Sequence, residues 1–184
     1  MIYPIYMYGN SILKNKALVI NKDEIDINKL SKDMFETMKL ADGIGLAAPQ
    51  IGKPFRVFVV DGTTLNDPNM SGFKKVFVNP KVLNEEGDLW EFEEGCLSIP
   101  LIKERIKRKS ILEIEYFDEN WKHHKEVFDG MKARIIQHEY DHIEGVLFTD
   151  YLTSFKKRLI KNKLLRISKG LVDVDYKIFP TKKQ

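Results

Sequence analysis

The sequence contains a single cysteine, Cys96, among 184 residues, so no disulfide can form within the chain. This excludes a small secreted scaffold held together by disulfides, and it favours a reducing compartment. Long apolar runs are also missing, since none approaches the roughly 18 residues that a membrane-spanning helix needs. Residues 1–4 lack the basic stretch followed by an apolar one that marks a signal peptide. These absences predict a cytoplasmic protein that does not enter a membrane.

Internal repeats, low-complexity segments and linkers rich in proline, glycine or serine are absent as well. Hydrophobic residues make up 43% of the chain and charged residues 31%, which is the composition of an ordinary folded protein. A chain of this length buries about 70% of the surface that its unfolded form exposes. We therefore expect a single domain that spans residues 1–184 and has a core of its own.

Charge is unevenly distributed, although the net charge of +3 is too small to indicate nucleic-acid binding by itself. Residues 150–184 hold ten basic and three acidic side chains, a net charge of +7, and the rest of the chain has a net charge of −4. A basic segment of this kind is typical of a solvated helix face. It is also found in segments that contact nucleic acids or membranes.

Hydrophobic periodicity predicts three helices, over residues 26–41, 130–144 and 153–169. Five apolar residues give the last helix a predicted core-facing side, namely Phe155, Leu159, Ile160, Leu164 and Ile167. Short runs of aromatic and β-branched residues predict strands over residues 55–60, 76–78, 81–83, 111–117 and 122–128. One helix, then many short strands, then two helices is the order of an α+β protein with an antiparallel sheet.

The most informative motif lies in the second predicted helix, where His138 and His142 flank Glu139. Residues four apart lie on one face of a helix, about 5–6 Å apart, so the two imidazoles can bind one metal ion. Glu139 follows the first imidazole and can approach a water molecule at the metal without being a ligand. Taken alone, the motif is also compatible with an ordinary polar helix turn.

A catalytic site of this type needs a third protein ligand and an open position. No histidine follows His142, and the only acidic side chain close behind it is Glu144. Upstream, Cys96 follows a glycine and several acidic residues. A lone cysteine is more often a small buried residue, yet its thiolate would suit Fe²⁺ or Zn²⁺. Residues 43–50 contain two glycines that permit a tight turn and close approach of a ligand, with Gln50 as a polar donor.

Together these stretches resemble the signature motifs of one family, the peptide deformylases. The three are Gly43-x-Gly45-x-Ala47-Ala48-x-Gln50, Glu94-Gly95-Cys96-Leu97-Ser98 and Gln137-His138-Glu139-x-x-His142. They occur in the family's order, and the likeness covers most of residues 1–152. Residues 153–184 resemble the family least.

This resemblance implies an α+β fold in which antiparallel sheets pack around a central metal-binding helix, with an N-terminal and a C-terminal helix. It implies metal-dependent hydrolysis that removes the N-formyl group from the formyl-methionine of nascent polypeptides and releases formate. Cys96, His138 and His142 would hold one divalent ion. The resemblance favours Fe²⁺ as that ion, with Zn²⁺, Ni²⁺ or Co²⁺ as other occupants.

The resemblance also implies roles for four further residues. Glu139 would act as the general base, taking a proton from water and returning it to the departing nitrogen. The Gln50 side chain and the backbone N–H of Leu97 would stabilise the oxyanion, and the backbone around Gly45 would align the peptide. By position, the candidates for a pocket that takes the methionine side chain are Ile44, Met131 and Ile135. Plain core packing explains these three equally well.

Formyl-methionyl nascent peptides are the partners that the resemblance implies. The basic helix and tail over residues 153–184 suggest a contact with the ribosome surface, where such peptides emerge. We expect the chain to act as a monomer. Metal-bound imidazoles usually donate their second N–H to a carboxylate or carbonyl, and Glu94 and Asp141 are the available carboxylates.

Two other interpretations fit the same histidines. A zincin-like endopeptidase would use His138 and His142 with a third ligand other than Cys96. A non-catalytic module would use all three residues in a closed structural site, which needs a fourth protein ligand. The options for that ligand are His123, His124 and Asp141, and none has convincing spacing.

Overall fold

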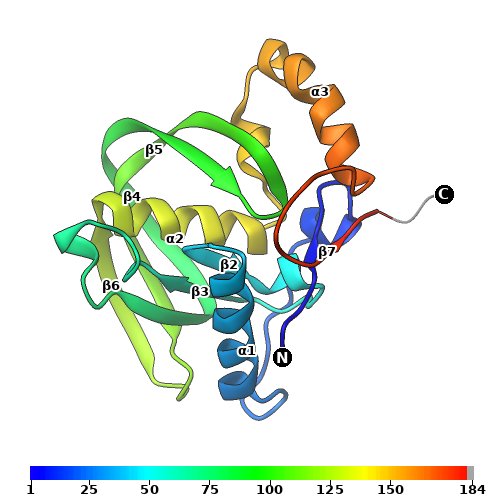
Figure 1. Ribbon diagram of the computed structural model, residues 1–184. Coiled ribbons are helices and arrows are strands. Elements are labelled where there is room, and N and C mark those ends of the chain that lie inside the picture. Colours follow the sequence, from blue (N-terminus) through cyan, green and yellow to red (C-terminus); the bar gives the residue numbers. More distant parts are fainter. Residues whose placement is uncertain (182–184) are drawn as a thin grey trace.

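A computed structural model describes residues 1–181 (Figure 1). Its strands are β1 (Ile5–Tyr6), β2 (Gly45–Ala47), β3 (Val57–Asp61), β4 (Lys74–Cys96), β5 (Ile99–Phe117), β6 (His123–Asp129) and β7 (Ile178–Phe179). Its helices are α1 (Ile27–Leu40), α2 (Gly130–Ile143) and α3 (Ser154–Ser168). Short 3-10 turns cover Ser11–Lys14, Ala48–Ile51, Pro68–Met70 and Phe148–Tyr151. The α+β class predicted from the order of the elements is confirmed.

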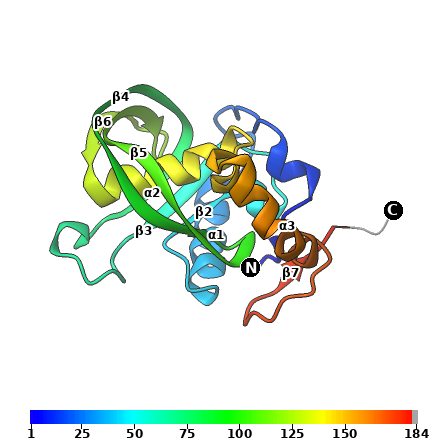
Figure 2. The same ribbon diagram turned by 90° about the horizontal axis from the view of Figure 1, so that it is seen from above.

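Five strands form one antiparallel sheet in the order β2-β3-β4-β5-β6. Its two longest strands, β4 and β5, extend far beyond the short runs predicted around residues 76–83 and 111–117. Residues 84–94 are almost all exposed and largely polar, so they carry no apolar alternation by which a strand is recognised. Register shifts between β4 and β5 bend the ladder, and Figures 1 and 2 show the long hairpin arching over α2.

Helix α2 lies in the middle of the molecule, enclosed by β2, β3 and β5. Its residues Ala133 and Ile136 are fully buried. An aromatic cluster lies on the sheet, where the Phe77 ring is stacked on Phe58 at 4.6 Å between centroids and is 4.3 Å from Tyr116. The central helix is therefore held by packing on several sides, which fixes the side chains that it carries.

The two outer helices begin where the sequence predicts. The Asp26 side chain accepts a hydrogen bond from the N–H of Lys29 at 2.9 Å and caps α1. Thr153 caps α3 through the N–H of Lys156. The predicted apolar face of α3 is only partly correct, because Phe155 and Leu159 are 63% and 65% exposed, while Ile160, Leu164 and Ile167 are buried. The helix contacts the body along one narrow stripe.

A second, two-stranded sheet joins the ends of the described chain. Strands β1 and β7 pair in parallel, with Ile5 opposite Ile178 and Tyr6 opposite Phe179. Figure 2 shows β7 next to the C-terminal part of α3. None of the helices within residues 1–181 is both long and apolar enough to cross a membrane.

Candidate metal centre and active site

The two histidines project from the second half of α2, one helical turn apart. The centroids of the His138 and His142 rings are 5.0 Å apart. His142 is almost fully buried, with 1% of its surface exposed. The helical spacing predicted from the sequence therefore brings both imidazoles to one side of the central helix.

Cys96 lies at the end of β4, before the tight turn into β5, and faces these rings. Its Sγ is 3.3 Å from Nε2 of His142. The ligand atoms of Cys96, His138 and His142 all lie within 4.8 Å of one another. One thiolate and two imidazoles form a donor set that suits a tetrahedral ion and leaves one position open. The structure thus contains a possible metal site made of the three residues that the sequence predicts.

Glu94 orients the first imidazole. Its Oε2 lies 2.9 Å from Nδ1 of His138, which leaves the other ring nitrogen for a metal ion. Arg108 donates two hydrogen bonds to the carboxylate, at 2.7 and 3.0 Å, and Arg134 donates one at 2.8 Å. Burial alone would raise the pKa of Glu94, but the hydrogen bonds from His138 and Arg108 outweigh it and hold this pKa well below its usual range.

The sequence did not predict a role for Arg108 or Arg134 at this site, because neither residue belongs to a recognisable motif. Arg108 and Arg134 are nonetheless 7% and 2% exposed, and the same carboxylate pairs with both. Of the two carboxylates considered for the imidazoles, the structure places Glu94 at His138. Asp141 instead accepts hydrogen bonds from Arg108 and Tyr151.

Glu139 lies in contact with Gly45 and is 4% exposed. Its Oε2 has no hydrogen-bond partner among residues 1–181. Burial raises the pKa of this carboxyl to about 7, although the charge of His138 opposes the shift. A carboxylate acceptor without a partner beside a metal-binding group is suited to accept a proton from a bound reactant.

Gln50 holds its amide toward Cys96. Its Oε1 accepts the N–H of Ala47 at 2.8 Å, which fixes which end of the amide faces the site. Its Nε2 lies 3.4 Å from Cys96 Sγ and 3.2 Å from Ser98 Oγ. Leu97 follows the cysteine directly, and its carbonyl accepts a hydrogen bond from the Tyr176 hydroxyl at 2.8 Å. Two potential donors, the Gln50 amide and the Leu97 backbone, therefore lie next to the thiol.

A cleft of about 620 Å³ opens onto these groups. Three of its lining residues are the candidates for an apolar pocket, Ile44, Met131 and Ile135. It also contains Gly45, Cys96, His138 and Glu139 in its wall, so an elongated ligand in the cleft reaches the metal-binding group. Gln137 does not face the cleft, because its side chain donates to Glu85.

The two remaining histidines lie away from this site. His124 Nε2 is 2.8 Å from Asp118 Oδ2, and His123 is half exposed on the same strand, β6. Among the residues that the structure describes, the possible metal-binding group has three members, Cys96, His138 and His142. This does not fit a closed structural site, which takes four protein ligands.

Known proteins identify the family to which this arrangement belongs. The family model for polypeptide deformylase matches residues 2–158. The chain belongs to the peptide deformylase family. It is 54% identical over 184 residues to a peptide deformylase of Cytophaga hutchinsonii, covering 100% of both chains. It is 47% identical over 194 aligned positions to one of Flavobacterium psychrophilum, again covering 100% of both.

Solved structures agree. A peptide deformylase from Legionella pneumophila superimposes with a TM-score of 0.81 at 32% identity, covering 93% of this chain and 98% of that one. A Plasmodium falciparum peptide deformylase in complex with an inhibitor gives a TM-score of 0.77 at 31% identity, covering 89% and 97%. As a peptide deformylase, the chain is a metal-dependent hydrolase that removes the N-formyl group from nascent peptides.

Proposed function

We propose that Cys96, His138 and His142 hold the catalytic ion of this deformylase and that Glu139 is its general base. The observation that supports this most directly is the meeting of the thiol with both imidazoles, all ligand atoms within 4.8 Å, beside a buried carboxylate. Glu94 is not a ligand of the ion in this arrangement. It accepts the second N–H of His138 and so fixes which ring nitrogen faces the ion.

An ion held by Cys96, His138 and His142 would supply a Lewis acid for the formyl carbonyl and would lower the pKa of the water that attacks it. Glu139 accepts the proton of that water through the oxygen that has no other partner in the described chain, and then gives it to the departing nitrogen. The water oxygen forms a bond to the formyl carbon, the carbon–nitrogen bond breaks as the nitrogen receives the proton, and formate and a free amine leave. Burial, which raises the pKa of Glu139 to about 7, suits a group that both takes and returns a proton.

The developing oxyanion would be stabilised by two donors from different elements. The Gln50 amide comes from the 3-10 turn after β2, and the Leu97 N–H comes from the turn between β4 and β5. The backbone of β2 at Gly45 would pair with the peptide as an added strand. The cleft lined by Ile44, Met131 and Ile135 would take the methionine side chain.

The test is formate release from formyl-Met-Ala-Ser under anaerobic conditions, with the metal content measured on the same sample. Glu139→Gln should abolish turnover and keep the metal, because Glu139 is not a ligand. Cys96→Ala should lose most of the metal. Retention of the metal by Cys96→Ala, together with cleavage of casein at internal bonds, would instead support a zincin-like endopeptidase that uses the two histidines alone.

For the ion itself we propose Fe²⁺, with Zn²⁺, Ni²⁺ or Co²⁺ as other occupants. A thiolate and two imidazoles accept all four ions. A ferrous site with a thiolate ligand is sensitive to oxygen, because the cysteine is oxidised once the metal leaves. Activity should therefore decay in air, and added thiol or catalase should slow the loss. Equal half-lives with and without oxygen would contradict an iron enzyme.

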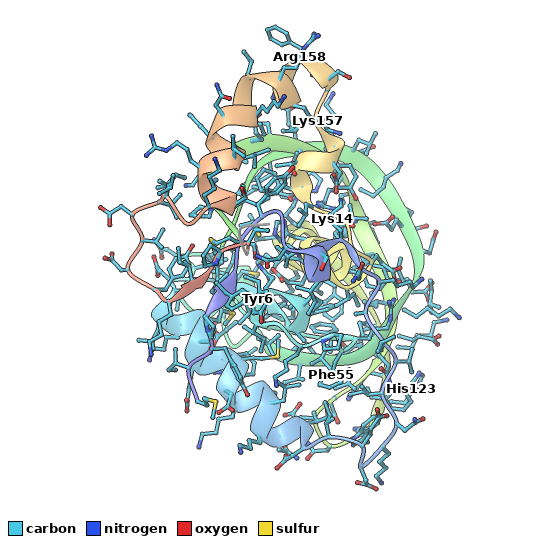
Figure 3. The ribbon with its side chains drawn as sticks, turned by 90° about the vertical axis from the view of Figure 1, so that its right-hand side faces the viewer. Tyr6, Lys14, Phe55, His123, Lys157 and Arg158 are labelled. Carbon is cyan, nitrogen blue, oxygen red and sulfur yellow. The ribbon has the colours of Figure 1, made fainter. Side chains whose placement is uncertain are left out.

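We further propose that the chain works in the cytoplasm as a monomer of one domain and that α3 contacts the ribosome. Figure 3 shows Lys157 and Arg158 on α3 at the edge of the molecule, and Lys161 is also exposed. Changing these three residues together to glutamine should weaken salt-sensitive co-sedimentation with ribosomes without altering hydrolysis of formyl-Met-Ala-Ser. Unchanged co-sedimentation of the triple variant would refute the contact with the ribosome.

The oligomeric state is a separate question. Size-exclusion chromatography with light scattering measures the molar mass in solution and so tests whether the chain is a monomer.

A further inference from the structure

The segment after α3 follows an alternating pattern. Over residues 171–178, which we call the strap together with residues 179–181, exposed and half-buried side chains alternate. The half-buried set is Val172, Val174, Tyr176 and Ile178. This alternation indicates that one side of the segment packs against the body, although the chain bends at residues 172, 175 and 176 and is a strand only at β7. The strap lies beyond residues 2–158, the part matched by the family model.

Several hydrogen bonds fix the strap in place. Its carbonyls at Lys177 and Phe179 accept the N–H groups of Ile5 and Met7, at 2.8 and 3.0 Å. The ring of Phe179 stacks on that of Tyr6, with centroids 4.4 Å apart, and Figure 3 shows Tyr6 on β1 beside this segment. The strap is therefore anchored to β1 and does not hang free at the end of α3.

The packed face of the strap reaches the cleft. Val174 and Tyr176 both line the cleft, whose wall also includes Cys96 and Leu97. The Tyr176 hydroxyl donates to the carbonyl of Leu97 at 2.8 Å, across 79 residues of sequence. The Leu97 side chain lies in turn against Gly43, where an added Cβ would come within 2.8 Å of it. Leu97 is thus held between the turn that precedes β2 and the strap.

We propose that the strap is a working part of the substrate cleft, with Tyr176 as a positioning residue for the Leu97 backbone and Val174 as a wall for the peptide beyond formyl-methionine. The candidates for the methionine pocket, Met131 and Ile135, lie in the first half of α2. Figure 1 shows the strap beyond the other end of that helix. The part of the cleft next to the strap is then left for the residues that follow methionine. This inference rests on the proposed role of Leu97 as an oxyanion donor.

The two halves of the proposal predict different kinetics. Tyr176→Phe keeps the ring and removes one hydrogen bond, so kcat should fall roughly two- to tenfold with KM nearly unchanged. The fall should be the same for formyl-Met-Ala-Ser and for formyl-methionine amide. Val174→Ala should raise KM about threefold or more for the tripeptide and leave the shorter substrate unaffected. Asp175→Asn, on the exposed face of the strap between them, is the matched control and should behave as wild type.

A second measurement does not depend on turnover. In zinc-loaded protein, amide hydrogen exchange over residues 96–100 should be faster in Tyr176→Phe, while exchange over β3 should be unchanged. Wild-type kcat in Tyr176→Phe, or faster exchange throughout that variant, would overturn the positioning role. If Val174→Ala changes KM equally for both substrates, Val174 does not contact the part of the peptide that follows formyl-methionine. Failure of the proposed function has a different signature, since Glu139→Gln would then keep its turnover or Cys96→Ala would keep its metal.

Discussion

Gly45 and the carboxylate of Glu139 lie so close together that a Cβ at position 45 would overlap the glutamate side chain. The glycine is on β2 and the glutamate is on α2, so two elements meet here without an intervening side chain. Close approach of this kind is what a residue without a Cβ permits. The position of the proposed general base is therefore set in part by a residue that contributes only backbone.

Gly45→Ala should displace the Glu139 carboxylate and lower kcat/KM about 100-fold, since a misplacement near 1 Å at a reacting group has effects of this size. The measurement is steady-state formate release, with metal content as a check that the ligands remain. Gly72→Ala is the control, because the new Cβ meets nothing within 4 Å there, although the positive φ of 69° strains an alanine and should cost some stability. That variant should keep full activity, and an equal loss in both would show that the contact is irrelevant.

Gln50→Glu tests the oxyanion donor with little change of shape. The new side chain can still accept the N–H of Ala47 through Oε1, but an anion replaces the amide donor near Cys96. Loss of one such donor typically costs a factor of about 100 to 1,000 in kcat. Asn162→Asp makes the same chemical change on the exposed side of α3 and should leave kcat unaltered. A kcat within threefold of wild type for Gln50→Glu would remove Gln50 from the mechanism.

Glu94→Gln should destabilise the fold by about 3 kcal/mol at pH 7, because it leaves the buried Arg134 without its counter-charge and leaves Arg108 with Asp141 alone. The pKa of Glu94 in the folded protein lies below its usual value of about 4.3. The carboxylate therefore contributes its full stabilisation above that value, and the contribution is lost as the pH falls toward the folded pKa.

Urea unfolding of metal-free protein at several pH values measures this directly. The difference in unfolding free energy between wild type and Glu94→Gln should be constant above about pH 5 and should shrink as the pH is lowered through 4. Glu91→Gln, exposed on the same strand, should show only a small difference at any pH. A difference for Glu94→Gln that grows on acidification would contradict the low pKa.

Phe77→Ala tests the aromatic cluster on the sheet, away from the metal-binding group. The ring is fully buried, stacks on Phe58 and lies tilted against Tyr116, so its loss should cost about 3–5 kcal/mol of unfolding free energy. Val127→Ala, at a site 64% exposed, should cost less than about 0.5 kcal/mol. Chemical denaturation measures both, and equal costs would show that the cluster is not a core.

Local signals predicted much of this molecule. The helix positions followed from hydrophobic periodicity, and the pairing of His138 with His142 followed from their spacing of four residues. Cys96 lies 42 residues before His138 in sequence, so from the residues alone it was one candidate for the third ligand, and the resemblance to the family assigned it to that place.

Other features depend on long-range contacts that leave no local pattern. Strands β4 and β5 are stabilised by pairing with each other, so their polar stretches could not be recognised from hydrophobicity. Arg108 on β5 and Arg134 on α2 pair with Glu94 only in the folded protein, so their role cannot be recognised from the sequence. The apolar–polar alternation of residues 172–178 is a local signal for the packed side of the strap, but it does not indicate which part of the body that side contacts.

The parallel pairing of β1 with β7 has a consequence for the order of synthesis. Residues 5 and 6 are synthesised before their partners at 178 and 179, which follow 173 residues later. Strand β1 can therefore pair with β7 only after the residues between them have been made. If the strap completes the cleft, a ribosome that stalls near codon 170 yields a protein with every metal ligand and an unfinished binding surface.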